Sequence, residues 1–136
     1  MIKPIMKSEF FLRLPSEDAG PDDAATGQDL LDTLHEHERE CVGLAANMIG
    51  VRKRIICVKD GNRTLLMYNP QILEQVNAYQ TSEGCLSLIG GRPCTRYRRI
   101  KVEYLDENFV HRIKNFSGYT AEIIQHEIDH CNGVVV

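Results

Sequence analysis

The spacing of apolar residues predicts a helix near the start of the chain, strands in the middle and a helix at the end. Residues 15–23 have loop composition, and Asp22 or Asp23 can cap the helix that follows. From Ala24 to about Glu40 the apolar residues recur at helical spacing, which leaves one face to be buried. These apolar positions are Ala24, Leu30, Leu31 and Leu34.

Antiparallel strands are expected through the middle of the chain, where short apolar or alternating runs are separated by turn residues. Asp60-Gly61-Asn62 predicts a hairpin turn, and Asn69-Pro70 is expected to interrupt the chain. Residues 82–93 are rich in glycine and serine, and residues 83–87 among them are expected to form a loop. The expected strands are residues 54–58, 65–68, 71–79, 100–105 and 109–116.

A second helix is predicted from Ser117 or Gly118 to about Cys131, with Gly133 as its stop signal. Its main apolar stripe is Ala121, Ile124, Ile128 and Cys131. Ile123 lies outside this stripe, so the helix is expected to be buried on more than one side. The order of elements predicts an α+β fold in which antiparallel β-sheets pack around a buried C-terminal helix.

Length and composition bound the classes of protein to consider. With 136 residues the chain can build one real core, so residues 1–136 are expected to form a single domain. The net charge of -3 is unlike the basic charge that is typical of nucleic-acid-binding domains, and no direct nucleic-acid binding is expected. No signal peptide or membrane span is recognisable. Five cysteines without a Cys-x-x-Cys pair favour thiols or metal ligands in a reducing cytoplasm.

The strongest chemical signal is the pattern His-Glu-x-x-His at residues 126–130, within the last predicted helix. On a helix, His126 and His130 stand one turn apart on the same face and can hold one metal ion. Glu127 lies beside the first histidine, where it can act as general base on a metal-bound water. The motif therefore predicts hydrolysis.

A catalytic metal site typically has three protein ligands, and the third must come from upstream of this helix. Cys131 follows His130 directly, so its side chain points about 100° away around the helix. Cys85 is the best candidate, because the glycine-bearing segment 83–87 can approach a site closely. Thiolate and imidazole suit Zn²⁺ or Fe²⁺, although a lone cysteine is as readily a small core residue.

The remaining cysteines and histidines are expected to have no chemical role. A lone cysteine is usually a small core residue or a simple surface residue, which is the interpretation of Cys41, Cys57 and Cys94. The histidines outside the motif are interpreted as surface residues, namely His35, His37 and His111.

Three segments together resemble the peptide deformylase family. The H-E-x-D-H motif of that family is met by residues 126–130, and its E-G-C-L-S motif is met in full by residues 83–87. Its G-x-G-x-A-A-x-Q motif is met only in part, by residues 41–48. The resemblance covers roughly residues 25–133, which is most of the chain.

The resemblance implies a metal-dependent hydrolase that removes the N-formyl group from N-formyl-methionyl peptides of nascent proteins. Cys85, His126 and His130 would hold one divalent metal, Fe²⁺ in the cell and often Zn²⁺, Ni²⁺ or Co²⁺ in purified protein. Glu127 would activate the metal-bound water, while the metal and the backbone N–H of Leu86 would stabilise the oxyanion. The enzyme would act in the cytoplasm on nascent chains, near the ribosome.

The same resemblance implies residues that bind the peptide and support the metal ligands. The extended peptide is expected to pair with the protein backbone as an added strand. The expected contacts are Val42, Gly43, Leu44, Glu83 and Gly84. Arg96 would form an ion pair with Glu83 that stiffens the cysteine segment, and Asp129 would do similar supporting work.

Two substitutions depart from the family pattern. Met48 stands in place of a glutamine whose amide donates to the oxyanion, and a thioether cannot donate; it can instead simply pack in an apolar wall. Neighbouring Asn47 can substitute only if it points into the site. Cys41 replaces a glycine and can narrow the mouth of the site. An alternative function therefore stays open: a deformylase-like protein with weak or altered amidase activity, or a metal-containing peptide-binding module.

Overall fold

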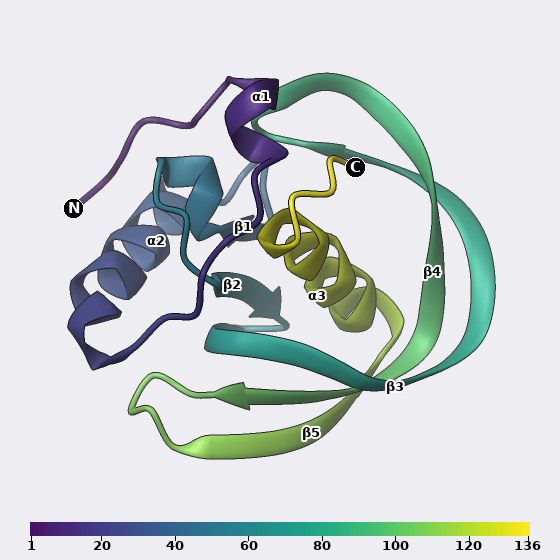
Figure 1. The fold of residues 1–136 in the computed structure, drawn as a ribbon. Helices are drawn as coiled ribbons and strands as arrows, with labels where there is room; N and C mark the ends of the chain where they lie inside the picture. The colour runs from purple at the N-terminus through teal and green to yellow at the C-terminus, as the bar shows by residue number, and fades with distance from the viewer.

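The computed structural model describes all residues 1–136 and consists of one curved antiparallel sheet around a central helix (Figure 1). The strands pair in chain order and are β1 (Gly43–Ala45), β2 (Ile55–Asp60), β3 (Arg63–Cys85), β4 (Leu88–Leu105) and β5 (His111–Ser117). The helices are α1 (Glu9–Leu12), α2 (Ala24–Glu36) and α3 (Gly118–Cys131). The predicted α+β class with a buried C-terminal helix is confirmed. None of the helices combines the length and apolar character that a membrane crossing requires.

The long β3–β4 hairpin curves around α3 (Figure 1). Its register shifts between Tyr68 and Gln71, where Asn69 adopts a φ of 54°. Such a bulge bends a strand without ending it, so the predicted interruption at Asn69-Pro70 is wrong. The Asn69 side chain exchanges two hydrogen bonds with the backbone of Ala19, at 2.7 and 2.9 Å, and so holds the N-terminal loop against the sheet.

The predicted loop at residues 83–87 is shorter in the structure, because β3 continues to Cys85 and β4 begins at Leu88. Only Leu86 and Ser87 form the turn between them. Ladder pairing, such as that of Ser82 with Pro93, overrides the weak strand preference of glycine and serine. Cys85 is therefore held at the end of a paired strand rather than in a free loop.

Helix α3 runs through the middle of the molecule, inside the curve of the sheet. Residues on several sides of it are buried, including Ile123, Ile124 and Ile128, as the two-sided apolar pattern predicts. The helix ends as expected before Gly133, which has a φ of 75° and lies directly against the backbone of Arg13. The burial of α3 carries His126, Glu127 and His130 into the interior.

Helix α2 packs on the other side of β1 and β2 (Figure 1). Leu30 and Leu34 are buried on the face that the spacing predicts, and the helix ends at Glu36 rather than near residue 40. Asp23 precedes the helix, but its carboxylate accepts a hydrogen bond from the Gly20 N–H at 2.8 Å instead of capping the helix. Between α2 and α3, strand β1 is left as one edge of the sheet.

Candidate active site

A cavity of about 570 Å³ lies where three distant segments meet. Residues 40–43 form one wall, the turn of the β3–β4 hairpin forms a second, and α3 forms a third. Cys85, His126 and Glu127 all line the cavity. The fold therefore brings the two full sequence motifs together around one space.

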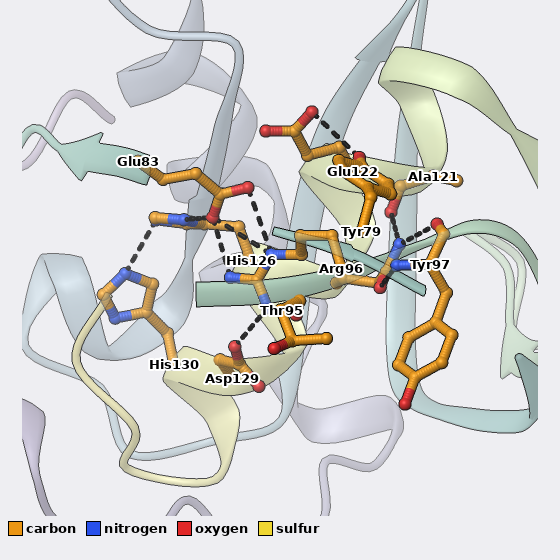
Figure 2. A network of polar contacts seen from close by, with 11 residues as sticks. Tyr79, Glu83, Thr95, Arg96, Tyr97, Ala121, Glu122, His126, Asp129 and His130 are labelled. Atoms are coloured by element: carbon orange, nitrogen blue, oxygen red, sulfur yellow. Dashed lines mark hydrogen bonds and ion pairs between the residues drawn. The ribbon is translucent and has the colours of Figure 1, made fainter. Parts of the chain in front are cut away.

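The two motif histidines face each other at the floor of the site (Figure 2). Their Nε2 atoms lie 3.3 Å apart, and both rings are buried. Burial, together with the neighbouring charge of His126, lowers the pKa of His130 to about 3. His130 is therefore neutral at physiological pH and keeps a lone pair for a ligand.

A chain of polar contacts fixes the orientation of His126 (Figure 2). Its Nδ1 lies 2.8 Å from Glu83 Oε1, and Arg96 Nη2 donates to the same oxygen at 2.7 Å. Arg96 Nη1 donates to Asp129 Oδ2 at 2.7 Å. Burial alone would raise the pKa of the Glu83 carboxyl, but hydrogen bonds from His126 and Arg96 lower it. Glu83 is therefore an anion, and it holds the imidazole with Nε2 directed away from it, toward His130.

Cys85 lies beside this histidine pair at the end of β3. Burial would raise the pKa of its thiol, but hydrogen bonds with His126 and with the backbone N–H groups of Leu88 and Ser87 lower it. Burial disfavours the cationic form of His126, yet its hydrogen bonds with Cys85 and Glu83 raise the pKa of this imidazole to about 10. The surroundings of Cys85 thus stabilise its thiolate form relative to that of a free cysteine.

Glu127 points into the same space from α3. The side chain is buried, and burial raises its pKa to about 7. Its Oε1 is buried without any hydrogen-bond partner. A carboxyl of this kind can both take and give a proton near neutral pH.

The residues present fit a divalent metal by the chemistry of their donors, although no three His, Cys, Asp or Glu side chains form a ready-made cluster that could hold one. The imidazoles of His126 and His130 direct their Nε2 atoms at each other, and Cys85 lines the same cavity as His126. A carboxylate behind a ligating histidine, as Glu83 is behind His126, is the usual support of such a ligand. His130 Nδ1 remains buried without a partner.

Met48 lines the cavity but is almost wholly buried, with 1% of its surface exposed. Its sulfur accepts a hydrogen bond from the Ala45 N–H at 3.5 Å. Asn47 does not replace the missing donor, because its Nδ2 donates to the His130 carbonyl at 2.9 Å. The wall around residue 48 therefore offers no side-chain N–H to the cavity from either residue.

Strand β1 forms the opposite wall with a free edge, since β2 pairs with only one side of it. Val42 and Gly43 line the cavity, and so does Cys41, whose thiol donates to the Gly43 carbonyl at 2.9 Å. The Leu44 side chain is fully buried in the core and does not line the cavity. The expected contact of Leu44 with substrate, which stays a prediction, would therefore be made by its backbone.

Glu83 and Gly84 line the cavity, as does Leu86, whose carbonyl accepts a hydrogen bond from Lys7 Nζ at 2.8 Å. All five cysteines are free thiols, and Cys57 is buried in the core. His35 and His111 are exposed, as expected of surface residues.

The sequence interpretation missed the outer part of the α3 wall. Tyr119, Glu122 and Ile123 line the cavity, and Tyr79 Oη donates to Glu122 Oε1 at 3.2 Å from the neighbouring strand. Helical spacing contains the signal that finds Glu122, because it lies four residues before His126 and hence on the same face.

The chain is similar to proteins of one family along its length. A family model described as polypeptide deformylase matches residues 6–136. A peptide deformylase of Clostridium beijerinckii is 51% identical over 136 residues, which are 100% of this chain and 100% of that protein. Peptide deformylase 1 of Clostridium perfringens is 39% identical over 111 residues, covering 79% of this chain and 74% of that protein.

Solved structures agree with the sequence comparison. A class I type b peptide deformylase from Acinetobacter baumannii with Met-Ala-Ser bound has a TM-score of 0.87 and 30% identity, covering 99% of this chain and 97% of that one. A peptide deformylase from Legionella pneumophila has a TM-score of 0.88 and 29% identity, covering 99% of this chain and 83% of that one. The family model and the full-length relative show that this chain belongs to the peptide deformylase family, a family of hydrolases.

Proposed function

We propose that this chain removes the N-formyl group from N-formyl-methionyl peptides of nascent proteins, with one divalent metal ion. The observation that carries the proposal is the buried Glu127 carboxyl, with one oxygen free, beside the facing imidazoles of His126 and His130. A similar structure, that of a peptide deformylase with Met-Ala-Ser bound, supports a peptide of this kind as substrate.

Cys85, His126 and His130 are the proposed metal ligands. Glu83 keeps the His126 ring oriented, and Arg96 keeps Glu83 in place with support from Asp129. A divalent ion held there would polarise the formyl carbonyl and lower the pKa of a water molecule. We propose Fe²⁺ as the metal in the cell, with Zn²⁺, Ni²⁺ or Co²⁺ as replacements in purified protein.

Glu127 is the proposed general base and acid. It takes a proton from the attacking water, whose oxygen bonds to the formyl carbon, and it delivers that proton to the amine nitrogen as the carbon–nitrogen bond breaks. The products are formate and a peptide with a free amino terminus. A pKa near 7 suits both transfers, because neither protonation state is then scarce.

The chain also offers groups that hold the substrate. The free edge of β1 at Val42 and Gly43 can pair with an extended peptide, as an added strand does. The turn at Glu83, Gly84 and Leu86 forms the facing wall, and the N–H of Leu86 is the proposed donor to the carbonyl oxygen. Leu44, whose side chain lies in the core, is proposed to take part in the same pairing through its backbone.

The proposed setting follows from the substrate. Formylated nascent chains are made on ribosomes, so we place the reaction in the cytoplasm and near the ribosome. Residues 1–136 would act as a single domain, because the site takes a wall from each third of the chain. The nascent peptide, rather than nucleic acid or membrane, is the proposed partner.

Met48 supports a second candidate function, a deformylase-like protein with weak or altered amidase activity, or a metal-containing peptide-binding module. The cavity lacks the side-chain donor that the family motif supplies at this position. Loss of one oxyanion donor lowers kcat by ~10²–10³, which slows deformylation without preventing peptide binding.

A comparison of two amide substrates separates these functions. Protein loaded with Fe²⁺ should convert formyl-Met-Ala-Ser to Met-Ala-Ser and leave acetyl-Met-Ala-Ser intact, as mass spectrometry of the products can follow. Chelation should abolish the reaction, and returning Fe²⁺, Zn²⁺, Ni²⁺ or Co²⁺ should restore it. Equal cleavage of both peptides would favour the altered amidase, and binding without cleavage of either would favour the peptide-binding module.

A further inference from the structure

Glu122 places a carboxyl group on the wall of the active-site cavity, one helical turn before His126. We propose that Glu122 determines a charge preference among substrate peptides, favouring a cationic side chain over an anionic one. This inference rests on the proposed function, because it concerns the peptide that the reaction consumes.

The charged groups that line the cavity are mostly acidic. No lysine or arginine is among the lining residues, and His126 is the only basic one. The acidic lining residues are Glu40, Glu83, Glu122 and Glu127. A concave surface of one sign concentrates its field on whatever enters it. A peptide therefore meets a negative potential on entering.

Two of these four acids are neutralised or buried. Arg96 pairs with Glu83 at 2.7 Å, and Glu127 is buried at the base of the cavity. Glu40 is exposed on the wall formed by residues 40–43. Glu122 is thus the acid on the α3 wall that is neither buried nor paired with a cation.

Glu122 makes no ion pair in the structure, and the neighbouring Glu83 carboxylate raises the pKa of its carboxyl. Its Oε1 accepts from the hydroxyl of Tyr79, a neutral donor (Figure 2). The guanidinium of Arg98 is stacked 4.6 Å over the ring of Tyr79 and does not pair with Glu122. The side chain is only partly buried, so a group of the substrate can reach it.

The surface beyond Glu122 leaves room for a substrate side chain. Tyr119 and Glu122 are shared by the cavity and by a second hollow of about 530 Å³. Arg98 and Arg99 also line that hollow. A side chain that leaves the cavity in this direction passes the Glu122 carboxyl, which borders both spaces.

Peptide geometry limits which substrate position is involved. Alternate side chains of an extended peptide point to opposite sides. If the first side chain faces α3 when the peptide lies along β1, the third faces α3 as well and the second faces away. Charge at the first or third position should therefore respond to Glu122, and charge at the second should not.

Coulomb's law gives the size of the effect. Two unit charges about 6 Å apart, at an effective dielectric constant of about 40, change a rate or binding constant about tenfold. Lysine should therefore be preferred over glutamate at least tenfold at the responsive position. Salt at about 1 M should weaken this preference, because the Debye length then falls to about 3 Å.

The test measures kcat/KM for formyl-methionyl tripeptides that carry Lys, Gln or Glu at the third position, and for a second series varied at the second position. A formyl-Xaa-Ala-Ser series covers the first position. Glu122→Gln keeps the side-chain size and the acceptor for Tyr79. Glu107→Gln, in the exposed turn between β4 and β5, removes the same charge far from the cavity and is the matched control. Affinities of the corresponding unformylated product peptides are measured in parallel by calorimetry.

Wild-type protein and Glu107→Gln should prefer lysine over glutamate at the first or third position. Glu122→Gln should bring the ratio of kcat/KM for the lysine peptide to kcat/KM for the glutamate peptide close to one. An unchanged ratio in Glu122→Gln, or a wild-type preference for glutamate, would overturn the inference. Failure to cleave any formyl peptide would count against the proposed function alone, because the product affinities still decide whether Glu122 discriminates charge.

Discussion

At residue 48, a buried methionine occupies the position at which the family motif has glutamine. Its sulfur faces the Ala45 N–H and offers no donor to the cavity. Met48→Gln should therefore raise kcat for formyl-Met-Ala-Ser by ~10- to 10³-fold, with a smaller change in KM, because the restored amide acts on the oxyanion. Steady-state kinetics on metal-matched samples measures this.

Met48→Leu is the matched control, because it fills the same space without adding a donor. It should leave kcat near the wild-type value. A gain in Met48→Leu equal to that in Met48→Gln, or no gain in Met48→Gln, would mean that a missing donor does not limit the rate.

Gly43 is required by the close approach of β1 to α3. A Cβ atom at this position would lie 2.7 Å from Ile123 Cγ2 and 3.0 Å from Glu127 Oε2. Gly43→Ala should displace the Glu127 carboxyl and lower kcat by roughly 100-fold, since small misplacements of catalytic groups have effects of that order. Gly20→Ala, where a Cβ meets nothing within 4 Å, should keep wild-type kinetics. Equal kcat values in the two variants would show that β1 does not position Glu127.

Among the elements, β4 is tied to β3 and α3 through one buried guanidinium. Arg96 contacts Glu83 on β3 and Asp129 on α3, each at 2.7 Å, and the Arg96 side chain is 5% exposed. Arg96→Met should lower the free energy of unfolding by about 3–5 kcal/mol, because it leaves the Glu83 carboxylate buried without its partner. Urea unfolding of the metal-free protein measures this.

The control for this variant is an exposed pair. Arg13 contacts Glu9 at 3.2 Å with both side chains about half exposed. Arg13→Met should therefore change the unfolding free energy by less than about 1 kcal/mol. A similar small change in Arg96→Met would contradict the view that this arginine holds the hairpin to α3.

The helices could be predicted from the sequence with more success than the long strands. Spacing of apolar residues located α2 and α3, because each helix buries a periodic face formed by neighbours in the chain. The prediction instead interrupts the β3–β4 hairpin at Asn69-Pro70 and places a loop at residues 83–87, where the strands are longer. Those segments are held extended by partners many residues away, and local composition does not carry that information.

The candidate site could likewise be predicted from the sequence only in part. Residues inside fixed motifs, such as Cys85 and His126, could be proposed from spacing and the family resemblance. Tyr79 could not, because its contact with Glu122 depends on how α3 lies against the curved sheet. The direction of the Leu44 side chain likewise depends on the pairing of β1 with β2.

In the whole molecule, the curved sheet surrounds helix α3, which carries acidic and basic groups into the interior. Buried groups such as Glu127 are costly unless they are paired or have a chemical role. The Glu83–Arg96–Asp129 contacts account for the supporting charges, but Glu127 Oε1 has no partner. The fold is therefore best understood as a scaffold that keeps one reactive carboxyl next to two imidazoles.

The most direct test of this account is the initial rate of formate release from formyl-Met-Ala-Ser by anaerobically purified, iron-loaded protein, beside Glu127→Ala with the same metal content. The wild type should release formate at a rate ~10²–10⁴ times that of Glu127→Ala. Equal rates in the two proteins, or no formate from wild-type protein that carries its metal, would contradict the assignment of Glu127 as the base of a working deformylase.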